Sequence, residues 1–276
     1  MENIQVLTKT NHIKKAQEKE DIMLNKERQE EVVELCQHLI QKQSYSGHED
    51  GVAGVLEEQL KKKGFDSVTV DKYGNVIGCI KGNRPGKKIL FDGHIDTVPV
   101  TDETEWQYPP FAAEIHDGKI YGRGTSDMKG AVAGFVTAAA AFAEDTKKDF
   151  AGEIYVAGVV HEECFEGVAA REISSFVKPD YVVIGEASQL NIKIGQRGRG
   201  EIVLETFGKP CHSANPEKGI NAVYKMAKVI EAIRTLEPTH HPVLGDGILE
   251  LTDIKSAPYP GASVVPEYCR ATYDRR

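Results

Sequence analysis

The sequence KILFDGHIDT spans residues 88–97 and decides the fold of the first part of the chain. Its apolar run, Ile89 to Phe91, is typical of a strand that is buried in a parallel sheet. His94 and Asp96 follow, where that strand should end. Residues two apart in extended backbone point to the same side, so Asp96 is placed to orient the ring of His94. This stretch therefore predicts an α/β sheet with polar chemistry at a strand end.

Helices and strands alternate on both sides of this stretch. Apolar residues at helical spacing predict helices, and short apolar runs predict strands. Upstream, the patterns predict two helices and then a strand pair, at 22–43, 52–60, 67–71 and 75–80. Downstream, they predict a helix, a strand, a helix and a strand, at 131–144, 152–160, 167–176 and 181–184. This order predicts an α/β fold with a mostly parallel sheet.

The pattern changes after Glu186. It predicts an exposed strand, a helix and two further strands, at 193–207, 221–236, 247–254 and 264–274. Such an order is typical of the opening of a small α+β domain, and it stops before a second helix could cover the sheet. We therefore divide the chain into a polar N-terminal extension (1–21), an α/β domain (22–194) and an α+β domain (195–276).

The composition is that of an ordinary folded protein: of 276 residues, 40% are hydrophobic and 28% are charged. A formal net charge of -8 argues against a nucleic acid or an anionic membrane as partner, because both need a basic surface. No run approaches the roughly 20 apolar residues of a membrane span, and the N-terminus lacks the apolar core of a signal peptide. We therefore expect a cytoplasmic protein, in which the five scattered cysteines are reduced thiols.

Acidic or imidazole groups occupy four successive junctions of the α/β domain, at His94, Asp127, Glu162–Glu163 and Glu186. Active sites of open α/β sheets lie at the carboxyl ends of strands, so we expect these groups to converge. Imidazole nitrogen and carboxylate oxygen are ligands that zinc, cobalt or manganese accept. Of the two adjacent glutamates, one can bind a metal while the other accepts a proton from bound water.

Each of these groups has a structural alternative when it is taken alone. His94 could be a hydrogen-bonded loop histidine, and Asp127 could cap the helix that follows it. The paired glutamates could be solvated loop acids. His212, in a turn-rich loop ahead of a helix, could stabilise the oxyanion of a tetrahedral intermediate or could be a surface histidine. Four such groups at successive junctions favour a site over four coincidences.

The runs GHIDTV, YGRGTSDMKG, HEE, GEAS and HSANPEKGINA together resemble the M20 family of metallopeptidases and deacylases, over about residues 30–276. IGQRGRGEI, CHSANPEKG and YDRR favour its YgeY-type branch of hydrolases linked to selenium metabolism. The resemblance implies a dizinc-type hydrolase of amide bonds in small N-acyl amino acids or dipeptides. It also implies that 22–194 is a zinc-hydrolase catalytic domain and that 195–276 is an inserted lid domain, through which the protein forms a homodimer.

The resemblance further implies which residues hold the metals. His94 and Glu186 would bind one zinc together with Asp127, which bridges to the second zinc. Glu163 would bind that second zinc. The family also has a cis peptide after the bridging aspartate, which implies one at Asp127–Met128.

Four more roles follow from the resemblance. Asp96 would support His94, and Glu162 would be the general base that activates the water between the metals and then protonates the leaving amine. His212 would reach the active site of the partner subunit. Arg276 would bind a substrate carboxylate.

In the M20 family a segment after the lid returns to the catalytic domain and carries one more histidine ligand, and no residue of this sequence matches it. We therefore expect both domains to be incomplete at the C-terminus and the second zinc site to be weakened, since a zinc site normally has at least three protein ligands. We also expect turnover near background. The alternative function is a non-catalytic remnant that binds one metal or a partner without turnover.

Overall fold

The computed structural model describes residues 25–165 and 167–276. The expected polar extension, 1–21, lies outside the described residues. The chain divides into two compact units, one that ends at Leu190 and one that spans Asn191–Arg276. The catalytic and lid roles inferred for 22–194 and 195–276 stay predictions.

The first unit is built on a five-stranded sheet with the order β1-β2-β6-β3-β7. In that order its strands are Ser67–Val70, Val76–Lys81, Ala151–Val159, Arg84–His94 and Tyr181–Ile184. β3 pairs in parallel with β6 and β7, whereas β2 pairs antiparallel with β1 and β6. The α/β prediction is confirmed, but the sheet is mixed. Only Gly82 and Asn83 separate β2 from β3, too few residues for the crossover that parallel strands require.

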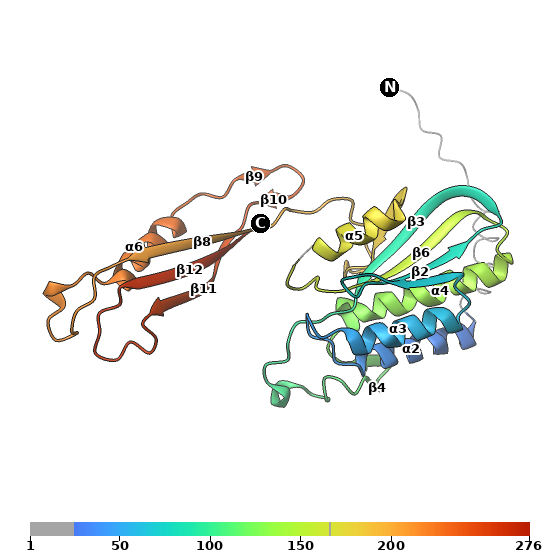
Figure 1. The fold of residues 1–276 in the computed structure, drawn as a ribbon, viewed down its shortest axis with the longest axis horizontal. Coiled ribbons are helices and arrows are strands. Elements are labelled where there is room, and N and C mark those ends of the chain that lie inside the picture. Colours follow the sequence, from blue (N-terminus) through green and yellow to red (C-terminus); the bar gives the residue numbers. More distant parts are fainter. Residues whose placement is uncertain (1–24, 166) are drawn as a thin grey trace, which may run out of the picture. The chain divides into compact units, whose positions relative to one another are not determined.

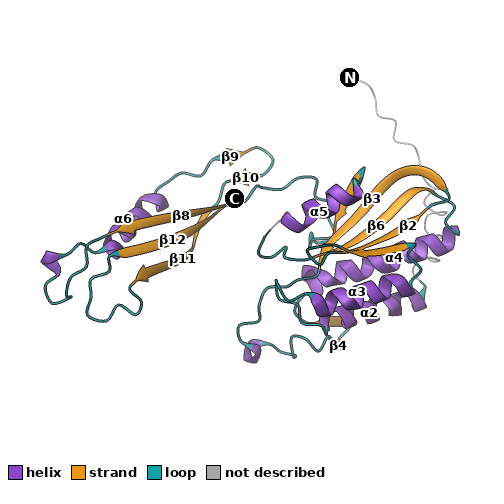
Figure 2. Cartoon of the chain, viewed as in Figure 1, coloured by secondary structure: helices purple, strands orange, loops and turns teal. Residues whose placement is uncertain are grey.

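Helices cover both faces of this sheet. They are α2 (Lys26–Ile40), α3 (Asp50–Lys62), α4 (Gly130–Thr146) and α5 (Val168–Val177). The first three lie on one face and α5 lies on the other (Figures 1 and 2). The predicted helices are therefore confirmed, apart from 22–24, which lie outside the described residues.

Two paired glycines let the helices approach the strand ends closely. Gly93 of β3 lies opposite Gly158 of β6. A Cβ atom on Gly93 would come within 2.8 Å of Val132, and one on Gly158 within 2.3 Å of Leu56. Both helix residues are fully buried. The core therefore reaches up to the end of β3, directly beneath His94.

A long connection between β3 and α4 carries four short elements. They are a 3-10 turn η1 (Glu103–Glu105), the hairpin strands β4 (Glu114–His116) and β5 (Lys119–Tyr121), and an irregular turn η2 (Thr125–Lys129). Gly124 precedes η2 with φ of 88°, a left-handed conformation that favours glycine. The glycine-rich run of the sequence thus makes the sharp turn that delivers Asp127 to the start of α4.

The second unit is a three-stranded antiparallel sheet in the order β11-β12-β8, with one long helix. Its main elements are β8 (Gly200–Phe207), α6 (Ala222–Arg234), β11 (Leu249–Ala257) and β12 (Tyr268–Arg275). Three shorter ones are η3 (Pro216–Lys218), β9 (His240–His241) and β10 (Gly245–Asp246). Met226 of α6 packs with Cys269, Ala271 and Tyr273 of β12.

The strand expected over 193–207 begins only at Gly200. Residues 193–199 form no strand, so the first half of that prediction is wrong. Gly195 and Gly198 interrupt the alternation there, and glycine is unfavourable inside strands. The strand predicted over 264–274 likewise begins later, because β12 starts at Tyr268 and residues 264–267 form no strand.

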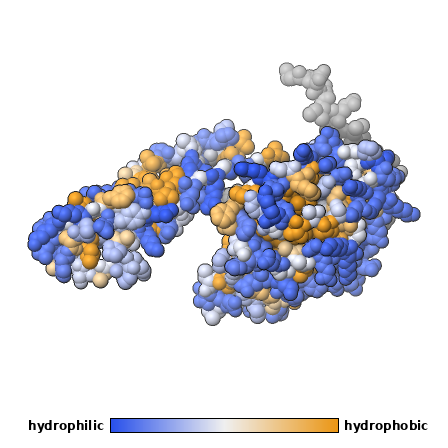
Figure 3. Space-filling view, in the orientation of Figure 1, coloured by the Kyte–Doolittle hydropathy of each residue, from blue (hydrophilic) through white to orange (hydrophobic). Residues whose placement is uncertain are grey.

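No helix within 25–165 or 167–276 is long and apolar enough to cross a membrane. Hydrophobic side chains nevertheless reach the surface of the first unit (Figure 3). Among them are the residues of β7, an edge strand whose side chains from Tyr181 to Ile184 are all exposed.

Candidate metal centre

The sheet brings together the carboxyl ends of three parallel strands. His94 is the last residue of β3, Glu162 and Glu163 follow β6, and Glu186 follows β7. Asp127 joins them from the turn η2 ahead of α4. Because parallel strands all end at one edge of a sheet, residues far apart in sequence meet there.

Three of these side chains offer ligand atoms to one point. Ligand atoms of His94, Asp127 and Glu186 all lie within 4.8 Å of one another. His94 Nε2 is 2.8 Å from Asp127 Oδ1 and 3.5 Å from Glu186 Oε1. No second group of three such residues meets this distance in the part of the chain that the structure describes.

Asp96 fixes the other side of the imidazole. His94 Nδ1 donates a hydrogen bond of 2.9 Å to the backbone carbonyl of Asp96. It also lies 3.4 Å from the carboxylate oxygen Oδ1 of the same residue. Both residues are almost completely buried. Nδ1 is therefore committed to Asp96, which directs Nε2 toward Asp127 and Glu186, as the HxD spacing predicts.

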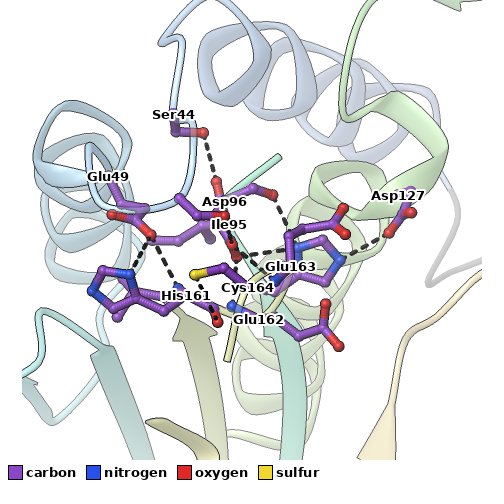
Figure 4. Close-up of polar contacts among 12 residues, drawn as sticks. Ser44, Glu49, Ile95, Asp96, Asp127, His161, Glu162, Glu163 and Cys164 are labelled. Atoms are coloured by element: carbon purple, nitrogen blue, oxygen red, sulfur yellow. Dashed lines mark hydrogen bonds and ion pairs between the residues drawn. The ribbon is translucent and has the colours of Figure 1, made fainter. Parts of the chain in front are cut away.

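The Asp96 carboxylate also holds the backbone of the two glutamates. The amide of Glu162 donates to Oδ1 at 3.2 Å, and the amide of Glu163 donates to Oδ2 at 3.1 Å. The Ser46 hydroxyl donates to Oδ2 at 2.6 Å. Figure 4 shows Asp96 between these segments. One buried carboxylate thus aligns the metal-facing histidine and the following strand end together.

The site is rich in negative charge. Burial and then the nearby Asp127 raise the pKa of Glu163. Burial also raises the pKa of Glu186, and His94 opposes that shift. Burial lowers the pKa of His94, but hydrogen bonds to Asp96 and Asp127 raise it more, to about 10. Without metal, His94 therefore carries a proton on both ring nitrogens, because the surrounding carboxylates stabilise its positive charge.

This donor set fits a divalent cation. Imidazole nitrogen and carboxylate oxygen are ligand atoms that zinc accepts, and three protein ligands is the usual number in a catalytic zinc site. The nitrogen that faces the carboxylates is the one left over after Asp96 has taken Nδ1, which is the usual arrangement around a metal-bound histidine. Replacing the His94 proton with a metal ion would satisfy the same carboxylates.

Asp127 does not cap α4. That helix begins at Gly130, and its capping position is Lys129, which makes no side-chain capping bond. The capping alternative is therefore wrong. The peptide bond Asp127–Met128 is cis, which confirms that expectation.

His212 and Arg276 lie in the second unit. Nδ1 of the exposed His212 accepts a hydrogen bond from the amide of Ala214 at 3.1 Å. Arg276 Nε donates to Asp274 Oδ2 at 2.9 Å. The oxyanion role of His212 and the carboxylate-binding role of Arg276 stay predictions.

Three residues that the sequence analysis missed support the site. Ser46 binds the Asp96 carboxylate, and Glu49 binds the backbone of His161. Lys129 is fully buried, and its Nζ donates to the carbonyls of Leu39 and Lys42. A lysine between Met128 and an apolar helix was a usable signal. Ser46 and Glu49 had none, because their partners are distant in sequence.

A family model described as peptidase family M20/M25/M40 matches residues 90–261. The chain is 32% identical over 259 residues to the uncharacterized protein YgeY of Escherichia coli K12, covering 91% of this chain and 62% of that protein. It is 31% identical over 257 residues to succinyl-diaminopimelate desuccinylase 2 of Ruegeria sp., covering 88% of this chain and 64% of that enzyme. The chain thus spans less than two thirds of the length of these curated relatives.

Among solved structures, the fold resembles an M20 family metallo-carboxypeptidase, Sso-CP2, from Sulfolobus solfataricus. The TM-score is 0.67 at 19% identity, covering 89% of this chain and 71% of that one. At this identity the likeness concerns the fold alone.

Proposed function

The chain belongs to peptidase family M20/M25/M40, and on that premise we propose that it is a metal-dependent hydrolase of amide bonds in small N-acyl amino acids or dipeptides. The observation that carries the proposal is the convergence of His94, Asp127 and Glu186 on one point. The substrate class is supported by a relative named a succinyl-diaminopimelate desuccinylase.

His94, Asp127 and Glu186 would hold one divalent cation, zinc foremost and cobalt or manganese as substitutes. Glu163 would hold a second, shared with Asp127. When bound, such metals lower the pKa of water and polarise the scissile carbonyl. Asp96 keeps the His94 ring in one orientation, so that the ligand nitrogen needs no rearrangement.

Glu162 is the proton carrier in this proposal. Its backbone amide is held by Asp96, as is that of Glu163. Adjacent residues of one strand end can thus take different roles, with Glu163 toward a metal and Glu162 toward water. Glu162 would accept a proton from the attacking water and return it to the leaving amine.

The second unit would contribute to substrate binding. His212 would donate a hydrogen bond to the oxyanion, and Arg276 would pair with a substrate carboxylate. A homodimer would bring His212 of one subunit to the active site of its partner.

A second candidate function is metal binding without turnover. It is favoured by one observation: Glu163 is not part of the single three-residue group found among the described residues. Under this alternative the chain binds one cation, and Glu162 has no role in it.

The test compares the wild type with Glu162→Gln. Both are loaded with zinc or cobalt, and metal content and turnover are measured on N-acetyl, N-succinyl and dipeptide substrates. Because the variant keeps the shape but loses the base, we expect unchanged metal content and loss of the turnover above background, since a general acid–base group contributes about 100- to 10,000-fold. Glu57→Gln, at the surface beside Lys61, is the matched control. The second candidate would be established instead if the wild type bound metal stoichiometrically and Glu162→Gln changed no turnover.

A further inference from the structure

We propose that Glu49 is a positioning residue for Glu162, through its hold on the backbone of His161. This proposal rests on the proposed function, because it concerns the geometry of the hydrolytic base. Glu49 lies in the connection between α2 and α3, in the segment 44–49, far from β6 in sequence. Nothing in the local pattern assigns it to the site.

The side chain of Glu49 serves the strand end and not its own helix. Glu49 occupies the capping position of α3 but makes no side-chain capping bond. It is only 5% exposed. Its Oε1 accepts the amide hydrogen of His161 at 3.0 Å and lies 3.5 Å from His161 Nδ1. A buried carboxylate needs such donors, and these are the partners that it has found.

His161 needs this support. Its φ is 59°, a left-handed conformation that non-glycine residues adopt only where their surroundings hold it. His161 is the second residue after the end of β6 at Val159, and it directly precedes Glu162 and Glu163. The direction taken at His161 therefore decides where the base points.

Two carboxylates hold three consecutive amides. Glu49 binds the amide of His161, and Asp96 binds those of Glu162 and Glu163. Figure 4 shows Glu49 near His161 and Asp96 near Glu163. If only one carboxylate bound the segment 161–163, the segment could rotate about that contact. Two carboxylates at different amides determine both its position and its direction. Glu49 is therefore the half of the support that does not touch the metal-binding histidine.

The segment 44–49 also ties Glu49 to the end of β3. The Ser44 hydroxyl donates to the carbonyl of Ile95 at 2.7 Å, and the amide of Thr97 donates to the carbonyl of Ser44 at 2.9 Å. Ser46 binds Asp96, as described above. Both anchors are thus tied to the same connection, 44–49, which is itself hydrogen-bonded to the end of β3.

The experiment separates position from charge with two variants. Glu49→Gln loses the charge but keeps an oxygen that can accept the His161 amide hydrogen. Glu49→Asp keeps the charge but is too short to reach it. Asp50→Asn is the matched control, since it removes an acid at the same helix end from an exposed side chain.

Two measurements are made on each protein. Amide hydrogen exchange of residues 161–163 is followed without metal, and kcat and KM are measured with zinc on an N-acyl amino acid. We expect Glu49→Asp to speed exchange at 161–163 and to lower kcat by about 10- to 100-fold with KM little changed. We expect Glu49→Gln and Asp50→Asn to stay close to the wild type in both.

The reverse order, with Glu49→Asp near wild type and Glu49→Gln impaired, would overturn the proposal in favour of a purely electrostatic effect. Unchanged exchange at 161–163 in Glu49→Asp would also overturn it, whatever the activity. Failure of the proposed function is seen separately, as a wild type without metal-dependent turnover.

Discussion

The two sides of the candidate metal centre differ in how they meet solvent. On one side, the His94 side chain is 1% exposed and that of Asp96 is 0% exposed. On the other, Asp127 is 59% exposed and Glu186 is 46% exposed. The buried side sits on the core helices, and the open side lies at a turn and after an edge strand.

This difference separates orientation from charge. Buried polar groups must be paired, so each donor and acceptor of the buried side has a fixed partner and the ring has one direction. The open carboxylates supply negative charge and leave room for an ion and a substrate. Substitutions on the buried side should therefore disturb the geometry of the ligands. They should lower metal affinity even where the substituted side chain does not bind the metal itself.

The largest effect is expected from His94→Ala. It removes the one nitrogen ligand of the three-residue group and leaves Asp127 and Glu186 without the imidazole between them. Substituting a residue that only hydrogen-bonds a metal ligand lowers metal affinity by up to roughly 100-fold. We expect the loss of the ligand itself to lower zinc affinity by more than that. Competition with a chromophoric chelator measures it. His116→Ala, which removes another histidine paired with an acid, is the control. Equal losses in both variants would contradict the site.

The fold was largely predictable because periodicity reports on burial. The helices α3 and α4 and the strands of the first unit follow from apolar spacing alone. The strand order of the mixed sheet was not predictable, because β6 lies between β2 and β3 although it comes much later in the chain. Strand order depends on tertiary packing, which local patterns do not encode.

The site was predictable as a set of acids and a histidine, since each stands at a strand end or a sharp turn. Its support was not. Glu49 and Ser46 look like ordinary loop residues, and only the folded chain places them against His161 and Asp96. The burial of Lys129 likewise depends on carbonyls at the end of α2, which lie some 90 residues earlier.

A smaller effect is expected from Asp96→Asn. Asparagine replaces one of the two oxygens that accept the amides of Glu162 and Glu163 with an amino group, which cannot accept. We expect zinc affinity and kcat each to fall by about 10- to 100-fold. Asp102→Asn is the control, because the exposed Asp102 also accepts a backbone amide, that of Thr104, in the turn η1. A wild-type kcat in Asp96→Asn would show that the buried side does not govern geometry.

The smallest effect is expected from a change of pH. It tests how the exposed carboxylates act on the protonation of the buried His94. The pKa of His94 is raised from its ordinary 6.5 to about 10 in the metal-free protein. Its contribution to folding stability is therefore complete below pH 6.5 and is lost as the pH rises toward 10. A metal ion must displace this proton from Nε2, so zinc affinity changes in the opposite sense and rises with pH.

We expect zinc affinity to rise by about tenfold per pH unit between pH 6.5 and 8.5, with about one proton released per ion bound. Chelator competition gives the slope, and titration calorimetry in buffers of different ionisation enthalpy gives the proton count. Asp96→Asn should make the slope shallower, because losing the carboxylate behind Nδ1 lowers the pKa of His94 toward its ordinary value. A flat profile without proton release would mean that the carboxylates do not hold a proton on His94. The open side of the centre would then be too well solvated to act on the buried one.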